Sequence, residues 1–311
     1  MSAPADTITY LDRATVRRLL PSRVEQMDVI ARTYVSMAHG RVENPPKIGV
    51  HPRSDAFVHV MPAYLRDDDV TGIKWVAAYP ANPARGLPYI SGLIVLNDSE
   101  TGLPLAVMDA AEITAVRTAA ASGVSIRHLA HEGWARVAIL GFGEQGRQHT
   151  EVVRTLDPDA EITVYAGPRP RDPGPGIRLA PDARAAVEGA DVVVTAGPMT
   201  RDDRRRLERD WLGERCLVVP VDFGAYVTAD LVAHADAFVV DDVEQFEHYR
   251  GLGHFQGWPE PVSSLGAALG AEPHGDLRVS CSLGVGAIDA ALTRLVWERA
   301  RDEGVGVHLP R

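Results

Sequence analysis

The chain has 311 residues, of which 45% are hydrophobic and 24% charged, as is usual for a folded globular protein. Its 32 basic and 42 acidic residues leave a net charge of −10, which argues against a nucleic-acid partner because an acidic surface repels phosphates. No apolar run is long enough to span a membrane, and the N-terminus lacks the apolar segment of a signal peptide. We therefore expect a cytoplasmic protein without a membrane partner, in which Cys216 and Cys281 are core residues.

The first 120 residues predict one long helix followed by short strands. Apolar residues recur at helical spacing over residues 12–39. Four short apolar runs, separated by turn residues, predict strands at 57–60, 73–77, 90–96 and 105–108. Because no helical pattern lies between these strands, we expect an antiparallel or mixed sheet.

The pattern changes at Asp109, which together with Glu112 resembles a capping box for a helix ending near Leu129. Beyond this helix, predicted strands alternate with predicted helices at 144–156 and 183–188. The strands fall at 137–140, 162–165, 192–195, 216–221 and 237–240. This alternation indicates an α/β fold with a parallel sheet of the Rossmann type. Residues 167–181 are too rich in Pro and Gly for a regular helix, and a final helix at 285–300 is expected to pack back on the first domain.

A glycine-rich sequence follows the first of these parallel strands. Gly141, Gly143 and Gly146 fit the pattern G-x-G-x-x-G between a predicted strand and a predicted helix. In a dinucleotide-binding site, the first glycine permits a tight turn and the second lets a pyrophosphate approach the backbone at the helix N-terminus. The alternative is a glycine-rich turn that binds no ligand.

The end of the next strand favours NADP(H) over NAD(H). An NAD site usually has an acidic residue there to bind the ribose 2′-hydroxyl, but this strand ends in Tyr165, Ala166 and Gly167. Arg169 and Arg171 follow, and guanidinium groups suit a 2′-phosphate. The alternative is that both arginines are solvated loop charges.

Two cations lie in apolar surroundings upstream of the glycine motif. Lys74 lies inside an apolar strand, and Arg117 lies in an alanine-rich helix. Charged residues seldom occupy such positions unless they are paired, and two converging cations could hold a carboxylate. The alternative is a buried ion pair with Glu112 or Asp109.

These features, together with several further short sequence motifs, resemble the ornithine cyclodeaminase/μ-crystallin family over about residues 40–300. These motifs include MPAYL at 61–65, GIKWV at 72–76, TGLPLAVMD at 101–109, RTAA at 117–120, GFGEQ at 141–145 and SLG at 282–284. The resemblance implies a substrate-binding and dimerisation domain of the α+β type, built from residues 1–120 and 285–311. It also implies a Rossmann domain at 121–284 and a homodimer.

The resemblance also assigns roles to individual residues. Lys74 and Arg117, with Lys47 as a third cation, would bind the carboxylate of a small-molecule substrate. Gln145 follows the glycine pair as in the family, and the resemblance implies that Ser282, Leu283 and Gly284 would lie where the chain passes the nicotinamide. The candidate cofactor-binding residues are Gly141, Gly143, Glu144, Gln145, Gly146, Arg169, Arg171, Thr195, Ala196, Val221, Ser282, Leu283 and Gly284.

The sequence departs from the ornithine cyclodeaminase pattern at two positions that bear on catalysis. His59 stands where those enzymes carry a Glu for the substrate's distal amine, and an imidazole is a poorer partner for an ammonium. Asp222 lies near their acid–base Asp but two residues early, so it is either a proton donor or a loop residue that binds backbone N–H groups. We take Asp222, Lys74 and His59 as the catalytic candidates.

The aromatic and His-rich segment 246–261 is expected to be a loop flanking the substrate cleft. His248 and His254 have no Cys or carboxylate partner at ligand spacing, so we expect no metal site.

Together these features predict an NAD(P)H-dependent reductase of an imine or 2-oxo acid that carries a carboxylate. One alternative is a cyclodeaminase, an ammonia-lyase that uses bound NAD on a basic amino acid. The other is a non-catalytic protein of the μ-crystallin type that binds a small ligand. Net oxidation of the cofactor would distinguish the reductase from the cyclodeaminase, which releases ammonia without net redox change.

Overall fold

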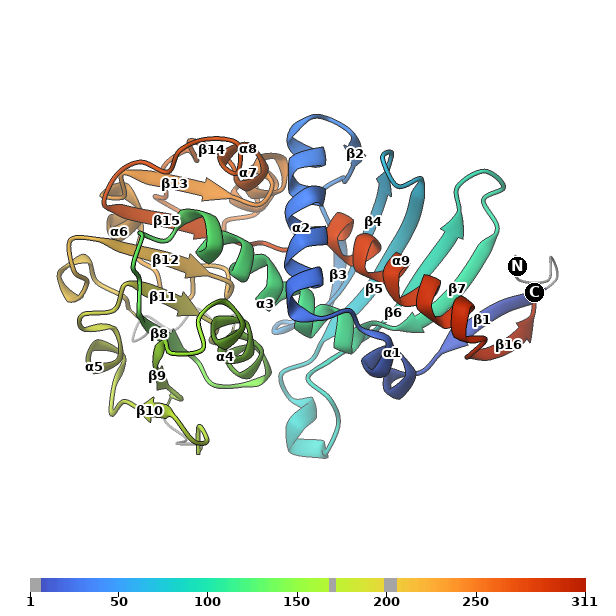
Figure 1. Cartoon of the computed structure of the whole chain (residues 1–311), viewed down its shortest axis with the longest axis horizontal. Coiled ribbons are helices and arrows are strands. Elements are labelled where there is room, and N and C mark those ends of the chain that lie inside the picture. Colours follow the sequence, from blue (N-terminus) through green and yellow to red (C-terminus); the bar gives the residue numbers. More distant parts are fainter. Residues whose placement is uncertain (1–6, 168–171, 199–205) are drawn as a thin grey trace. The chain divides into compact units, whose positions relative to one another are not determined.

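The computed structural model describes residues 7–167, 172–198 and 206–311, which form two compact units (Figure 1). Unit 1 comprises the described residues up to Arg117 together with Val285–Arg311, and unit 2 comprises Thr118–Gly284. Helix α3 (Ala110–Leu129) contributes its first residues to unit 1 and the remainder to unit 2. None of the helices in the described ranges is long and apolar enough to cross a membrane.

Unit 1 is built on a mixed sheet, as the sequence predicted. Its strands have the order β16-β1-β7-β6-β5-β4-β2, with β3 also paired to β4. Strands β1 and β7 are parallel, and the other pairs are antiparallel. The strand bounds are β1 Thr7–Leu11, β2 Val42–Glu43, β3 Ile48–Arg53, β4 Ala56–Leu65, β5 Val70–Ala78, β6 Ile90–Asp98, β7 Pro104–Asp109 and β16 Val307–Pro310. A 3-10 turn, η1 (Asn82–Arg85), lies between β5 and β6.

The single N-terminal helix predicted over 12–39 is wrong, because two helices occupy this stretch: α1 (Arg13–Leu19) and α2 (Arg23–Ala38). Pro21 disfavours helical backbone at Leu20, which is extended in the structure. A new helix then begins with a capping box, in which Ser22 Oγ accepts a hydrogen bond from Glu25 N and Ser22 N donates to the Glu25 carboxylate.

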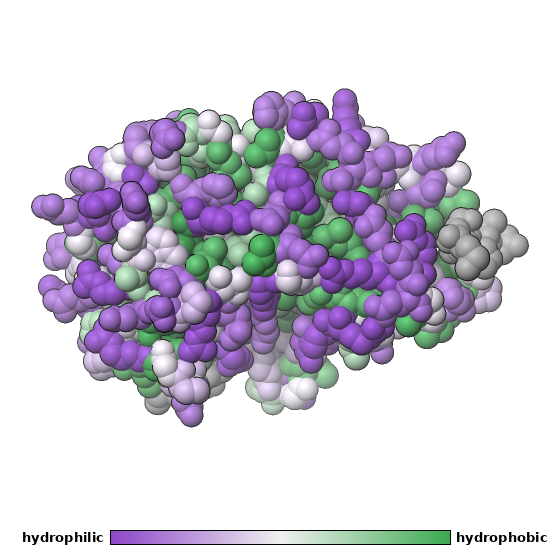
Figure 2. All heavy atoms as spheres, in the orientation of Figure 1, coloured by the Kyte–Doolittle hydropathy of each residue, from purple (hydrophilic) through white to green (hydrophobic). Residues whose placement is uncertain are grey.

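The C-terminal helix α9 (Gly286–Glu303) packs against β4, β5 and α2 of unit 1, on one face of the sheet (Figure 1). Its start lies so close to β4 that a Cβ on Gly286 would be 2.8 Å from the Met61 carbonyl oxygen. Asn44 Oδ1 accepts a hydrogen bond from Ala287 N at 3.0 Å, which satisfies one free N–H of the helix N-terminus. Hydrophilic side chains predominate on the face of the molecule that Figure 2 shows.

The predicted capping box at the start of α3 is also wrong. Asp109 Oδ1 does accept a hydrogen bond from Ala111 N at 2.9 Å. The Glu112 carboxylate, however, binds Arg13 and Arg17 of α1, each at 2.6 Å. Two guanidinium groups are stronger partners for a carboxylate than one backbone N–H, so Glu112 ties α3 to α1.

Unit 2 contains a parallel sheet with the order β10-β9-β8-β11-β12-β15-β13-β14. Its strands are β8 Arg136–Leu140, β9 Glu161–Tyr165, β10 Ile177–Leu179, β11 Val192–Thr195, β12 Cys216–Pro220, β13 Ala237–Val240, β14 Ser263–Ser264 and β15 Leu277–Cys281. Its other elements are α4 Glu144–Leu156, α5 Ala183–Val187, η2 Arg209–Trp211, α6 Ala229–Ala233, α7 Val243–Gly251 and α8 Leu265–Ala268. The strand order reverses between β8 and β11, and open α/β sheets bind ligands at such a point.

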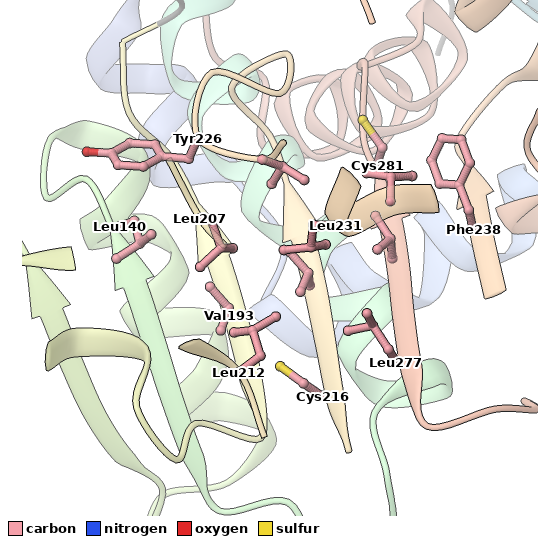
Figure 3. Packing of buried hydrophobic residues seen from close by; sticks show 14 of the residues in the cluster. Leu140, Val193, Leu207, Leu212, Cys216, Tyr226, Leu231, Phe238, Leu277 and Cys281 are labelled. Carbon is pink, nitrogen blue, oxygen red and sulfur yellow. The ribbon is translucent and has the colours of Figure 1, made fainter. Parts of the chain in front are cut away.

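Apolar side chains from these strands, from the helices and from the adjoining loops form the core of unit 2 (Figure 3). Cys216 and Cys281 belong to it as buried residues that are not joined in a disulfide. Strand β15 went unrecognised in the sequence, because its polar positions Arg278 and Ser280 interrupt the apolar pattern. The predicted loop at 246–261 is wrong in its first part, since α7 continues to Gly251, capped at its start by Asp242. The described part of 167–181 contains β10 and no helix.

Candidate functional site

The turn between β8 and α4 has the geometry of a dinucleotide-binding turn. Gly141 has a φ of 106°, and a Cβ there would lie 2.5 Å from the Ala196 carbonyl oxygen. A Cβ on Gly146 would lie 2.2 Å from the Gly141 oxygen, so the helix packs tightly on the turn. At Gly143, which caps α4 without a side-chain hydrogen bond, a Cβ would meet nothing within 4 Å. The first and third glycines therefore serve packing, and the second leaves space beside free N–H groups.

Beside the glycine turn and at the end of β15, two buried polar atoms make no hydrogen bond to any described residue. They are Oε1 of Gln145, on the first turn of α4, and Oγ of Ser282, directly after β15. Glu144, which directly precedes Gln145, is exposed and lies near Gln148 and Arg147 of its own helix. Buried polar groups normally have partners, so these two atoms fit a site that a polar cofactor completes.

Asp222 connects the ends of two neighbouring strands, β11 and β12. Its Oδ1 accepts a hydrogen bond from Thr195 Oγ at 2.8 Å, and its Oδ2 accepts one from Gly197 N at 3.1 Å. Val221 N donates to the Thr195 carbonyl oxygen at 2.9 Å. Burial raises the pKa of Asp222 to about 6, although the hydrogen bonds from Thr195 and Gly197 oppose this shift. These contacts favour the loop-bracing interpretation of Asp222.

The segment after β15 is held by side chains of the β13–α7 turn and of α7 itself. Gly284, with a φ of 81°, donates its N–H to Asp241 Oδ2 at 2.6 Å. Its carbonyl oxygen accepts a hydrogen bond from Gln245 Nε2 at 3.0 Å. Ser282 N donates to the Pro220 carbonyl oxygen at 3.0 Å, and Leu283 between them is buried. The strand-end residues predicted from the sequence thus lie at the carboxyl ends of β8, β11, β12 and β15, on one edge of the sheet.

Only some of the residues predicted to select NADP(H) belong to the described part of the chain. Strand β9 ends at Tyr165 without an acidic residue, and Ala166 and Gly167 follow. Arg169 and Arg171 lie outside the described residues. Arg147 and Arg154 of α4 line a hollow of about 270 Å³ that is also bounded by residues 172–174.

In unit 1, the two predicted cations share one carboxylate. Lys74 Nζ lies 2.6 Å from Asp289 Oδ2, and Arg117 Nε lies 3.3 Å from Asp289 Oδ1. All three residues are buried. The Lys74 ammonium has three N–H groups and the Arg117 guanidinium has five, so both cations can donate to a ligand as well as to Asp289. Burial, followed by repulsion from Arg117, lowers the pKa of Lys74 to about 8, against the attraction of Asp289.

His59 and Lys47 are the remaining predicted residues of unit 1. Met61 pairs with Lys74 across β4 and β5, so His59, two residues away, lies on the same face of the sheet as Lys74. The imidazole stacks on Phe57 with ring centroids 4.0 Å apart, and it covers Gly49, where a Cβ would lie 2.3 Å from His59 Cδ2. Lys47 is buried and directly precedes β3.

Sequence reasoning missed Asp289, Asp241 and Gln245. It considered Glu112 and Asp109 as ion-pair partners of the cations, but Glu112 binds two arginines and Asp109 binds Ala111 N. Asp289 could have been found from the sequence, because it is a lone carboxylate within the apolar stretch of the last helix. No group of three or more His, Cys, Asp or Glu side chains among the described residues is arranged to bind a metal ion.

Comparison with known proteins gives a consistent result for the whole chain. A model of the ornithine cyclodeaminase/mu-crystallin family matches residues 9–304. The nodulation efficiency protein NfeD of Rhizobium meliloti is 34% identical to this chain, and the match covers 98% of each protein.

Two solved structures have the same fold. The Delta(1)-pyrroline-2-carboxylate reductase of Thermococcus litoralis, in complex with NADH and L-proline, is 25% identical. The match covers 97% of this chain and 100% of that one, with a TM-score of 0.82. An archaeal alanine dehydrogenase dimer with bound NAD is 26% identical, covers 97% of this chain and 99% of its own, and has a TM-score of 0.83.

Proposed function

The chain belongs to the ornithine cyclodeaminase/mu-crystallin family, and we propose that it is an NAD(P)H-dependent reductase of an imine or 2-oxo acid that carries a carboxylate. The observation that carries this proposal is the cluster in which Lys74 and Arg117 share Asp289. Two cations and one carboxylate leave one positive charge in a buried place, and such a charge requires an anion. Relatives named as reductases and dehydrogenases of small amino or imino acids support the same chemistry.

We assign the two binding tasks to different units. The β8–α4 turn of unit 2 holds the pyrophosphate, with Gly143 leaving room and the α4 N-terminus supplying N–H groups. When bound, the reduced nicotinamide supplies a hydride to the substrate carbon. In unit 1, Lys74 and Arg117 hold the substrate carboxylate, with Lys47 as a third cation.

Reduction of a neutral imine also requires a proton at its nitrogen, and we assign this proton to Lys74. Its lowered pKa of about 8 keeps it charged at neutral pH yet makes it a better acid than an ordinary lysine. We do not assign this proton to Asp222 or His59, because both Asp222 oxygens accept hydrogen bonds within unit 2 and the His59 ring is packed on Phe57. Lys74 recovers the lost proton from solvent after the product leaves.

In the direct test, the purified protein is incubated with cyclic imino acids and NADPH and, separately, with ornithine and NAD or NADP. We expect stoichiometric loss of NADPH absorbance with an imino acid and little ammonia from ornithine. We expect little ammonia from ornithine because His59 replaces the Glu that would bind its distal amine. A buried ammonium without a carboxylate partner is strongly disfavoured. Proline and ammonia formed from ornithine as fast as the imine is reduced would refute the reductase assignment in favour of a cyclodeaminase. Ligand binding without turnover would favour a binding protein.

For the cofactor, we propose a preference for NADP(H) over NAD(H). The support is the lack of an acidic residue at the end of β9 and the presence of Arg169 and Arg171 just beyond it. Arg147 and Arg154, beside the adjacent hollow, add positive charge on the same side of α4.

We further propose a homodimer formed through the sheet face of unit 1 that α9 does not cover. Val60 pairs with both Ile48 and Trp75, and Trp75 pairs with Leu93, so these apolar residues form a row on one face. Ile48, Trp75 and Leu93 are 65%, 58% and 43% exposed, and exposed apolar patches commonly mark interfaces. A second copy of the chain is the occupant that we propose, since the similar archaeal alanine dehydrogenase is a dimer. We also propose a cytoplasmic location, because Cys216 and Cys281 are buried and not joined in a disulfide.

A further inference from the structure

Lysine is almost absent from this chain, and where it occurs it is buried. The sequence contains two lysines, Lys47 and Lys74, among its 32 basic residues, and all the others are arginines. Lys47 is 7% exposed and Lys74 is 1% exposed. The protein thus uses arginine for its surface charges and lysine at two buried places in unit 1. An ammonium differs from a guanidinium in being compact and in losing its proton more readily when buried, and the lowered pKa of Lys74 is an example.

The surroundings of Lys74 leave its charge dependent on a single carboxylate. Its neighbours across the sheet are apolar, Met61 on β4 and Ile94 on β6. Arg117 from α3 and Asp289 from α9 are the charged groups that act on it. Among the described residues, Asp289 is the one carboxylate that pairs with either cation.

The charges themselves indicate what Asp289 does. Burial and the like charge of Arg117 both favour loss of the Lys74 proton, and only Asp289 opposes them. The carboxylate lies between the two cations, 2.6 Å from Lys74 and 3.3 Å from Arg117, so it also fixes where the ammonium lies. With Asp289 present the three groups carry one net positive charge, which one substrate carboxylate would neutralise.

We propose that Asp289 is a positioning residue that keeps the Lys74 ammonium charged and in place before the substrate binds. This inference rests on the proposed function, because it treats Lys74 as a substrate-binding and proton-donating group. Asp289 need not touch the substrate. It acts through Lys74, as the internal counter-ion that a carboxylate substrate then complements.

The test observes the titration of Lys74 directly in the full-length protein, without substrate. Lysine labelled with ¹⁵N or ¹³C in the side chain gives two sets of signals, and Lys47→Arg removes one set and so assigns the other. In the wild type, Lys74 should titrate near pH 8. In Asp289→Asn the midpoint should fall by at least one pH unit, since the attraction is lost while burial and Arg117 remain. An unchanged midpoint would overturn the proposal.

A matched control on the same helix is Glu298→Gln, which removes the ion pair of Glu298 with Arg294 and should leave the Lys74 midpoint where it was. If Asp289→Asn does not fold, the Lys74 midpoints with and without Asp289 are compared in the Arg117→Gln background, where Arg117 no longer repels Lys74. There the additional Asp289→Asn change leaves the same net charge as the wild-type cluster and should still lower the Lys74 midpoint. A midpoint equal to that of Arg117→Gln alone would also refute the proposal.

The activity assay separates this inference from the proposed function. In an active protein, Asp289→Asn should move the alkaline limb of kcat/KM to lower pH, with activity recovering on acidification. A purely structural role would lower thermal stability without moving this limb, and that result would count against Asp289 as counter-ion. A wild type that reduces no imino or oxo acid would refute the reductase, but the lysine titration would still decide the role of Asp289.

Discussion

The Asp222 carboxylate accepts a hydrogen bond from the Thr195 hydroxyl at 2.8 Å and thereby joins the ends of two adjacent parallel strands. A second hydrogen bond, from Gly197 N, extends this connection to the residues after β11. We predict that Asp222→Asn keeps kcat within about threefold and raises the KM for the cofactor, because an amide offers one acceptor oxygen in place of two. Steady-state kinetics in both substrates measures this. A loss of kcat beyond a hundredfold with normal cofactor KM would instead make Asp222 the proton donor.

The same residue predicts a pH dependence of stability. The folded protein holds a proton on Asp222 up to about pH 6, whereas the unfolded chain releases it near pH 4. Folding therefore binds a proton in this window, and stability from this group decreases as the pH rises from about 4 to 6. The difference between the two pKa values corresponds to a change of about 2–3 kcal/mol in the free energy of unfolding. Thermal melts across this range should show the decrease in the wild type but less of it in Asp222→Asn; parallel curves would contradict the raised pKa.

Removing either cation of unit 1 should abolish most activity while the fold survives. Lys74→Met leaves Asp289 with Arg117, and Arg117→Met leaves it with Lys74, so neither variant strands a buried charge without a partner. We expect kcat/KM to fall at least a hundredfold, from loss of charge-assisted contacts to the substrate carboxylate. Arg18→Ala, which breaks an exposed ion pair with Glu303, is the control. Variants that melt far below the wild type but keep full activity per folded molecule would contradict the carboxylate-binding role.

Gly143 offers a test of the cofactor site that separates binding from stability. Because a Cβ at Gly143 meets nothing within 4 Å, Gly143→Ala should change the free energy of unfolding by less than about 1 kcal/mol. The added methyl group would occupy the space assigned to the pyrophosphate, so the Kd for NADPH should rise at least tenfold. Gly213→Ala, at another open glycine of unit 2, serves as the control and should leave binding unchanged. Unaltered NADPH binding by Gly143→Ala would place the cofactor elsewhere.

The preference for NADP(H) predicts that the double replacement Arg169→Ala and Arg171→Ala raises the KM for NADPH at least tenfold and hardly changes that for NADH. Each charge-assisted contact to a 2′-phosphate contributes on the order of 1.5–3 kcal/mol, whereas NADH has no such phosphate. The measurement is the KM for both cofactors in the wild type and in the variant. Equal wild-type affinity for the two cofactors would remove the basis of this prediction.

The uncovered sheet face predicts the oligomeric state. Trp75→Glu places a charge in the centre of the apolar row and should convert a dimer into a monomer in light scattering coupled to size-exclusion chromatography. Leu252→Glu is the matched control, since Leu252 is 60% exposed and lies in unit 2. A wild type that is already monomeric, or a dimer unaffected by Trp75→Glu, would show that this face is not the interface.

Much of the fold could be predicted from local patterns, because they depend on neighbouring residues. The helix α4 and the strands β11 and β13 occur where the apolar periodicity predicted them. The glycine turn was also recognisable, since tight turns and close packing require glycine whatever the rest of the chain does. Local patterns failed where one residue alters the backbone, as Pro21 does by dividing the first helix in two.

The partners of the charged groups were decided by the tertiary structure. The sequence showed that Lys74 and Arg117 lie among apolar residues and therefore need an anion, but it offered Glu112 and Asp109 as nearby candidates. Helix α9 returns to the sheet of unit 1 and brings Asp289 to both cations, while α1 engages Glu112. A sequence determines that a buried charge must be compensated, because desolvation is costly everywhere. Which carboxylate compensates it depends on the face against which a distant helix packs, and only the folded chain determines that.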